Sequence, residues 1–165
     1  ASFTEDGFFK TGDAGYIKNG ELFLKERIKD LFKTSNGKYI APQQIEALLL
    51  VDKFVEQVAV IADQRKFVSA LIVPSYLQIE DWARNNGVKF DSHEDLCENP
   101  KVRAMMKERI DTLQQTLSHY EQIKRFTLLP KPFTMESGEL TNTLKMRRKV
   151  INEHYKKEIE NMYAE

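Results

Sequence analysis

The sequence is poor in cysteine and lacks any long apolar run. Its only cysteine, Cys97, cannot close an internal disulfide, and nothing resembles the paired cysteines of a structural zinc site. No segment approaches the roughly 20 apolar residues that span a bilayer, and the N-terminus lacks a basic-then-apolar signal pattern. We therefore expect a soluble chain in a reducing cytoplasm. The start at Ala1, without an initiator methionine, suggests a piece of a longer protein.

The sequence also has no excess of charge of either sign. Its 25 Lys and Arg balance 25 Asp and Glu, so the broad positive field of a nucleic-acid-binding protein is missing. The three histidines, His93, His119 and His154, lack any metal-ligand spacing, and we expect no metal site within this chain. Neither a Gly-x-Ser-x-Gly frame nor a phosphate-loop pattern is present, which argues against hydrolase and kinase functions.

The apolar patterns predict strands and helices in one mixed fold. Hairpin turns are predicted at Asn19-Gly20 and at residues 35–37, and residues 1–28 are predicted to be β structure. Compact apolar runs predict core strands at residues 58–62 and 67–73, and residues 123–129 are predicted to form a third core strand. Helical spacing predicts helices at residues 43–51, 77–85, 99–120 and 145–162, the third capped by Asn99.

An acidic residue lies in a glycine-rich turn near the N-terminus. Asp13 follows Gly12 and precedes Gly15, a setting in which a carboxylate can accept two hydrogen bonds from the vicinal hydroxyls of a ribose. The alternative is that Asp13 only orders the turn through bonds to its own backbone. The residues alone leave both readings open.

Two groups of cations could likewise have either a functional, anion-binding role or a purely structural one. Residues 145–149 place four cations where we expect a helix to start, although the helix dipole disfavours positive charge there. Either this is a solvated basic face, or a mobile loop delivers Lys145 to an anionic reaction centre. Arg27, Lys29 and Lys33 alternate, and in an extended segment they would share one face that binds phosphate or protects a strand edge.

In order along the chain, these segments resemble the C-terminal motifs of adenylate-forming enzymes, which include acyl-CoA synthetases, firefly luciferase and peptide-synthetase adenylation domains. Residues 6–13 (DGFFKTGD) are similar to the segment whose last aspartate holds the ribose of ATP. Residues 26–33 (ERIKDLFK) and 36–46 (NGKYIAPQQIE) are similar to the hinge motif. Residues 139–148 (ELTNTLKMRR) resemble the terminal lysine motif in the form typical of long-chain synthetases.

The resemblance assigns Lys145 as the catalytic lysine of adenylation. Leu144 stands where most relatives have glycine, and Asn142 stands where many have proline. These departures predict a loop that is stiffer or differently placed than in typical members.

Five further residues receive roles from the same resemblance. Asp13 and Arg27 would bind the nucleotide, with Asp13 on the ribose. Lys29 would be the hinge. Lys33 and Gly37, in the second hairpin, would face the active site on the coenzyme A side during thioester formation.

The resemblance implies an α+β fold class. A β-hairpin and a three-stranded sheet packed by helices would form a small C-terminal domain, preceded by a β-hairpin from a large N-terminal domain. Residues 1–28 would end the N-terminal AMP-binding domain, and residues 29–165 would form a mobile lid. The helical stretch 77–120 resembles an insertion of long-chain and bacterial long-chain-like synthetases.

The implied activity is that of a long-chain fatty acid CoA ligase. A fatty acid and ATP would give an acyl-adenylate and pyrophosphate, and coenzyme A would then displace AMP. Mg²⁺ is expected for the parent enzyme but not in this chain, which should be inactive without its partner, the N-terminal domain.

Peripheral membrane association of the parent stays open. So do two alternatives: another adenylate-forming enzyme (a carrier-protein ligase or luciferase-like oxygenase), and a non-catalytic interaction domain that binds acidic partners or anionic lipid.

Overall fold

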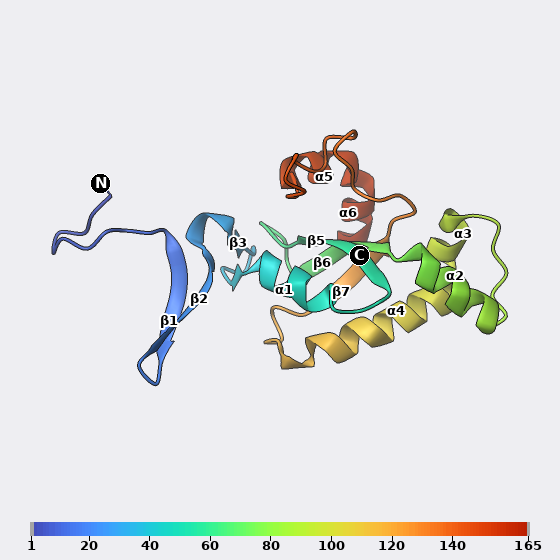
Figure 1. The fold of residues 1–165 in the computed structure, drawn as a ribbon, viewed down its shortest axis with the longest axis horizontal. Helices are drawn as coiled ribbons and strands as arrows, with labels where there is room; N and C mark the ends of the chain where they lie inside the picture. Colours follow the sequence, from blue (N-terminus) through green and yellow to red (C-terminus); the bar gives the residue numbers. More distant parts are fainter. Residues whose placement is uncertain (1, 165) are drawn as a thin grey trace.

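A three-stranded sheet forms the centre of the molecule (Figure 1). The computed structural model describes residues 2–164, apart from the side chains of Lys25 and Glu26. The central strand pairs antiparallel with one neighbour and parallel with the other. The strands, in spatial order, are β5 (Val55–Ile61), β6 (Val68–Pro74) and β7 (Ile123–Leu128). The α+β class and the three predicted core strands are thus confirmed.

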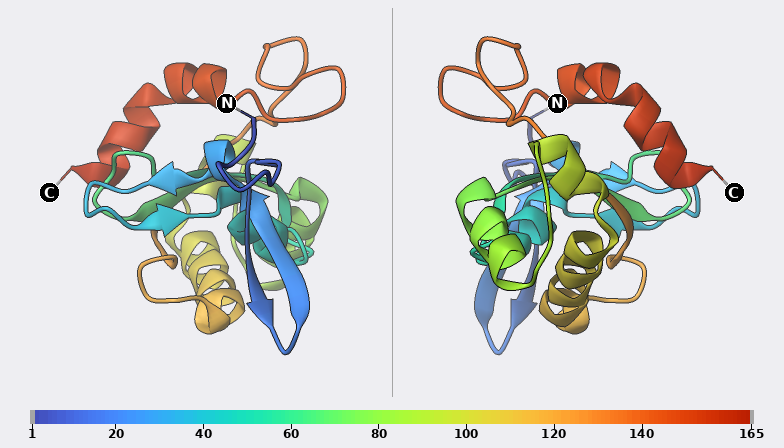
Figure 2. Two further views of the ribbon diagram at one scale, coloured as in Figure 1. Left: turned by 90° about the vertical axis from the view of Figure 1, so that its left-hand side faces the viewer. Right: turned by 90° about the vertical axis from the view of Figure 1, so that its right-hand side faces the viewer.

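Helices cover both faces of this sheet and bury two apolar clusters (Figures 1 and 2). Along β6, Ala70 and Ile72 belong to the first cluster, whereas Leu71 and Val73 belong to the second, because successive side chains of a strand point to opposite faces. The first face carries α1 (Pro42–Leu49), α2 (Tyr76–Asn85), α3 (His93–Glu98) and α4 (Pro100–Leu113). The second face carries α5 (Arg148–His154) and α6 (Lys156–Tyr163).

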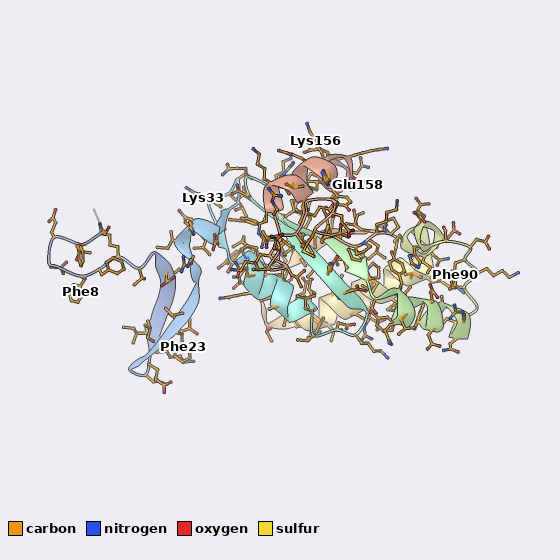
Figure 3. The ribbon with its side chains drawn as sticks, turned by 45° about the horizontal axis from the view of Figure 1, so that its top comes forward. Phe8, Phe23, Lys33, Phe90, Lys156 and Glu158 are labelled. Atoms are coloured by element: carbon orange, nitrogen blue, oxygen red, sulfur yellow. The ribbon has the colours of Figure 1, made fainter. Side chains whose placement is uncertain are left out.

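The N-terminal hairpin projects from this body (Figure 1). Strands β1 (Asp13–Lys18) and β2 (Glu21–Arg27) turn at Asn19 and Gly20, whose φ angles of 53° and 82° fit the primed turn that the sequence predicts. Phe8 and Phe23 lie on the projecting part, away from the main body (Figure 3). A bulge interrupts the pairing beside Gly15, where a Cβ atom would lie 2.6 Å from the Phe23 carbonyl oxygen. Only glycine fits this close approach.

A short 3₁₀ turn joins the hairpin to the main body. It covers Ile28–Asp30, so the segment is not extended, and the expected single face of Arg27, Lys29 and Lys33 does not form. Strands β3 (Phe32–Lys33) and β4 (Tyr39–Ile40) follow as the second predicted hairpin. Its tip is fixed to the β5–β6 turn, because the Ser35 amide donates to the Arg65 carbonyl at 2.9 Å.

Two helical predictions need correction, and one helix was not predicted. The helix expected to reach Tyr120 ends at Leu113, and a 3₁₀ turn covers Gln114–Thr116. The helix expected over 145–162 begins only at Arg148 and breaks at Tyr155, where φ is −104° and ψ is 27°. Helix α3 was not predicted, although its capping box is visible in the sequence as Ser92 with an acid three residues later. Among residues 2–164, no helix has both the length and the apolar character needed to cross a membrane.

Candidate nucleotide site

One polar pocket of about 600 Å³ brings together residues from distant parts of the sequence. It lies between the N-terminal hairpin, the 3₁₀ turn, the start of α1 and the loop that precedes α5. Four of its residues are candidates from the sequence, contributed by segments more than a hundred positions apart. The pocket is lined by Asp13, Leu24, Arg27, Lys29, Asp30, Gln43 and Lys145.

The N-terminal hairpin sets the geometry of Asp13 and Arg27. The two residues are paired across β1 and β2, and the guanidinium Nε of Arg27 lies 3.8 Å from Oδ1 of Asp13. The Arg27 side chain is 63% exposed, so this contact is a surface ion pair worth at most about 1 kcal/mol. Both groups therefore remain available to a ligand in the pocket.

Lys145 is carried by a small β-hairpin in the loop between β7 and α5, which lies on the same side of the sheet as α5 and α6 (Figure 2). Leu140 and Met146 form an antiparallel bridge. Nearer the tip, the Thr141 amide donates to the Lys145 carbonyl at 2.8 Å, and the Lys145 amide donates to Oγ1 of Thr141 at 3.0 Å. The backbone of Lys145 is thus fixed at both its polar groups, while its side chain is exposed at the pocket.

Leu144 turns the tip of this hairpin in a left-handed conformation. Its φ is 59°, a value that glycine adopts freely and that leucine adopts only with strain. Leu144 thus adopts a backbone conformation that suits glycine, and the stiffer or differently placed loop stays a prediction.

The basic cluster 145–149 is divided among different environments. Arg148 forms two 2.8 Å hydrogen bonds to the buried carboxylate of Glu46, which also accepts from the Val60 amide at 2.8 Å. Arg148 is therefore a structural cation. Lys149 is exposed and lies at a different depression, between α5 and β5, so Lys145 is the cation of this cluster that lines the site.

Two other predicted site residues lie outside this pocket. Lys33 and Gly37 belong to the β3–β4 hairpin and do not line it. The Lys33 ammonium lies 5.8 Å from the centre of the Tyr39 ring, and Figure 3 shows the residue near the junction between the N-terminal hairpin and the body. Gly37 has a φ of 76° and closes the hairpin turn, where its amide donates to the Thr34 carbonyl.

Sequence reasoning did not single out three of the lining residues. Asp30 and Gln43 lie within the two segments similar to the hinge motif, and Leu24 supplies an apolar wall from β2. Gln43 follows Pro42 at the first turn of α1, so a helix N-terminus beside the predicted hinge was the available signal.

The charges in the pocket suit a nucleotide better than a metal ion. Arg27, Lys29 and Lys145 face Asp13 and Asp30, which leaves one positive charge for an anion and keeps carboxylates for hydroxyl groups. Among the described side chains, no three His, Cys, Asp or Glu gather closely enough to hold a metal. The net positive charge of the pocket therefore favours an anionic group such as a phosphate.

Known proteins share this architecture. The fold matches the adenylation domain of a carboxylate reductase from Mycobacterium chelonae (26% identity, TM-score 0.76), over 99% of this chain and 24% of that one. It also matches the A domain of carboxylic acid reductase from Segniliparus rugosus, solved with AMP and a co-purified carboxylic acid (25% identity, TM-score 0.74, 98% and 24% coverage). The small-domain fold is thus that of adenylate-forming enzymes.

A family model described as the AMP-binding enzyme C-terminal domain matches residues 29–165, and the chain belongs to this family. Curated relatives include a peroxisomal long chain acyl-CoA synthetase 6 of Arabidopsis thaliana, 36% identical over 98% of this chain. The long-chain-fatty-acid–CoA ligase FadD15 of Mycobacterium tuberculosis is also 36% identical, over 96% of the chain. The chain spans 24% and 27% of the length of these two relatives.

Proposed function

We propose that this chain is the C-terminal part of a long-chain fatty acid CoA ligase, and that its polar pocket is the part of the adenylation site contributed by the hinge and lid. The observation that carries the proposal is the shared pocket of Asp13, Arg27, Lys29 and Lys145. The names of the curated relatives support the substrate class, a long-chain fatty acid. The AMP in a related solved structure supports a nucleotide ligand.

In the proposed first step, a fatty acid carboxylate attacks the α-phosphate of ATP and pyrophosphate leaves. Two anions must meet, so a cation between them lowers the barrier, and such an electrostatic contribution is often worth about 3 kcal/mol. Lys145 supplies this charge from a hairpin whose backbone is fixed. Asp13 accepts hydrogen bonds from the ribose hydroxyls, and Arg27 binds the ribose and phosphate region.

In the proposed second step, the domain rotates about Lys29 and coenzyme A displaces AMP. The β3–β4 hairpin, with Lys33 and Gly37, then faces the active site. Its separation from the polar pocket supports two faces used in turn, because Lys33 and Gly37 lie outside the residues that line the pocket. Any Mg²⁺ that the parent enzyme uses would be held outside this chain.

The proposed partner is the N-terminal domain of the same polypeptide. We assign residues 1–28 to the end of that domain and residues 29–165 to the mobile lid. The N-terminal part exposes several large apolar side chains, which an interface with that domain would cover. The exposed apolar side chains of the projecting part include Phe3, Phe8, Phe9, Ile17, Leu22 and Leu24.

The predicted reducing cytoplasmic location also stays a proposal, since one relative is named as peroxisomal.

The test compares Lys145→Ala with the unmodified full-length parent enzyme. We expect fatty-acid-dependent ATP–pyrophosphate exchange to fall on the order of 100-fold or more, while thioester formation from preformed acyl-adenylate persists. Lys149→Ala is the matched control, because Lys149 is an exposed cation of the same cluster outside the pocket. Unchanged exchange in Lys145→Ala would contradict the assignment.

A second adenylate-forming function is favoured by one observation, the fold match to adenylation domains of carboxylic acid reductases. Such an enzyme shares the adenylation step but passes the acyl group to a different thiol. Supplying coenzyme A or a carrier-protein thiol to the preformed acyl-adenylate separates the two functions. Thioester formation with free coenzyme A supports the ligase.

A further inference from the structure

A buried carboxylate lies at the base of the hairpin that carries Lys145. Glu139 is 3% exposed, and its oxygens accept hydrogen bonds from Oγ of Ser137 at 2.7 Å and from the Thr134 amide at 3.2 Å. Nδ1 of His154 lies 3.0 Å from the other oxygen, and the Tyr155 hydroxyl also interacts with the carboxylate. Because a carboxylate only accepts, Nδ1 of His154 carries the proton in this contact.

These partners keep Glu139 ionised although it is buried. Burial would raise its pKa, but the hydrogen bonds from His154, Ser137, Thr134 and Tyr155 outweigh burial and hold the pKa below its ordinary value. Burial and the adjacent Glu139 charge raise the pKa of Tyr155 to about 12, so the tyrosine keeps its proton as a donor. A buried charge with this many donors fixes the groups around it, because each lost partner would be left unsatisfied.

The backbone of Glu139 connects this cluster to Lys145. The Glu139 carbonyl accepts from the Arg147 amide at 2.7 Å, which closes the base of the hairpin. The Leu140–Met146 bridge and the Thr141–Lys145 pair continue the ladder to the tip. The carboxylate contacts His154, the last residue of α5, and interacts with Tyr155, the residue that follows it. Glu139 thus links the lysine hairpin to the α5–α6 junction across the end of one helix.

We propose that Glu139, together with His154, is a positioning residue for Lys145. The two residues hold the lysine hairpin in the position from which the Lys145 ammonium reaches the polar pocket. The inference rests on the proposed adenylation function and adds a residue to it. Neither side chain lines the pocket, so both act through the hairpin backbone. Misplacement of a catalytic group by about 1 Å can cost 100-fold in rate, which makes a fixed base functionally important.

The experiment uses the full-length parent enzyme and compares the two half-reactions in four variants. Glu139→Gln removes the charge at nearly constant shape, and His154→Leu removes the donor to it. His154→Asn keeps a donor at the position of Nδ1. The matched control is Glu136→Gln, which removes the same charge from an exposed position of the same loop.

We expect Glu139→Gln and His154→Leu to lose roughly tenfold or more in fatty-acid-dependent ATP–pyrophosphate exchange. Thioester formation from preformed acyl-adenylate should stay unchanged, His154→Asn should recover most of the exchange, and Glu136→Gln should match the parent. Proportional loss of both half-reactions, or full exchange in Glu139→Gln, would overturn the inference. If Glu139→Gln fails to fold, the difference between His154→Leu and His154→Asn decides.

Lys145→Ala, measured beside these variants, separates a failure of the positioning role of Glu139 from a failure of the proposed adenylation function. Lost exchange in Lys145→Ala with full exchange in Glu139→Gln overturns the positioning role alone. Retained exchange in Lys145→Ala overturns the proposed function, and the positioning role with it.

Discussion

At the scale of single residues, Leu144 holds a left-handed backbone conformation that leucine rarely adopts. A left-handed φ of 59° costs a non-glycine residue roughly 1–2 kcal/mol, and Leu144 is 67% exposed, so its packing contributes little stability in return. Glycine removes this strain but loses about 0.5–1 kcal/mol of conformational entropy on folding. Leu144→Gly should therefore leave the free energy of unfolding unchanged or raise it slightly.

Asn142→Gly gives the matched control in the same turn. Asn142 is exposed and has no positive φ, so glycine there should only add entropy to the unfolded chain and lower stability by about 0.5–1 kcal/mol. Urea unfolding of both variants measures the difference. A larger loss in Leu144→Gly than in Asn142→Gly would show that Leu144 makes contacts that outweigh its strain.

Candidate site residues inside recognisable motifs could be singled out from the sequence. Residues whose role depends on a partner far away in the sequence could not. Asp13 and Lys145 were found because each lies in a segment similar to a family motif. Glu139 lies in the same segment, but its importance depends on His154, which is fifteen positions away and unrelated in pattern. Arg148 was grouped with the other cations because its partner Glu46, 102 positions away, cannot be read from local sequence.

At the scale of elements, the Glu46–Arg148 pair joins α1, β5 and the start of α5. The Glu46 side chain is only 6% exposed, and it satisfies both Arg148 and the Val60 amide. Glu46→Ala leaves a half-buried guanidinium and a buried amide without this partner, so the free energy of unfolding should fall by about 3 kcal/mol. Glu108→Ala, at an exposed position of α4, should change it by less than about 0.5 kcal/mol. Equal losses in urea unfolding would contradict a specific role of the pair.

Periodicity of apolar residues could not predict that the helix expected over residues 145–162 is divided into α5 and α6. Ile151, Tyr155, Ile159 and Met162 keep a helical spacing that continues in phase across the break, so the pattern cannot reveal it. The break is visible only in the backbone of Tyr155, whose ring packs edge-on against Phe133 at 5.7 Å. The central strand β6 was easier to predict, because its compact apolar run, rich in β-branched residues, is buried along its whole length.

At the scale of the whole molecule, the N-terminal hairpin and the body are distinct in their cores. Neither buried apolar cluster, as far as the described residues go, includes a residue before Phe32. Residues 29–165 should therefore fold without the hairpin and unfold cooperatively at nearly the same temperature as the whole chain. Thermal unfolding followed by circular dichroism tests this, and loss of a cooperative transition on removing residues 1–28 would contradict the proposed boundary.

The proposed rotation about Lys29 gives the last prediction, made for the full-length parent enzyme. Lys29 is the middle residue of the 3₁₀ turn between the hairpin and the body. Proline fixes φ near −65°, a value that a 3₁₀ turn permits, so Lys29→Pro should keep the arrangement that forms the polar pocket. It should also block the backbone rotation that the second step requires.

Relative to Lys29→Ala, adenylation should thus persist in Lys29→Pro while thioester formation falls on the order of 100-fold, the scale expected when a catalytic arrangement cannot form. Lys29→Ala is the control, because it removes the same ammonium from the pocket but leaves the backbone free to rotate. Exchange of ATP with pyrophosphate and thioester formation from preformed acyl-adenylate measure the two steps separately. Equal loss of both in Lys29→Pro would count against the hinge, whereas a thioester defect shared with Lys29→Ala would assign the effect to the side chain's charge.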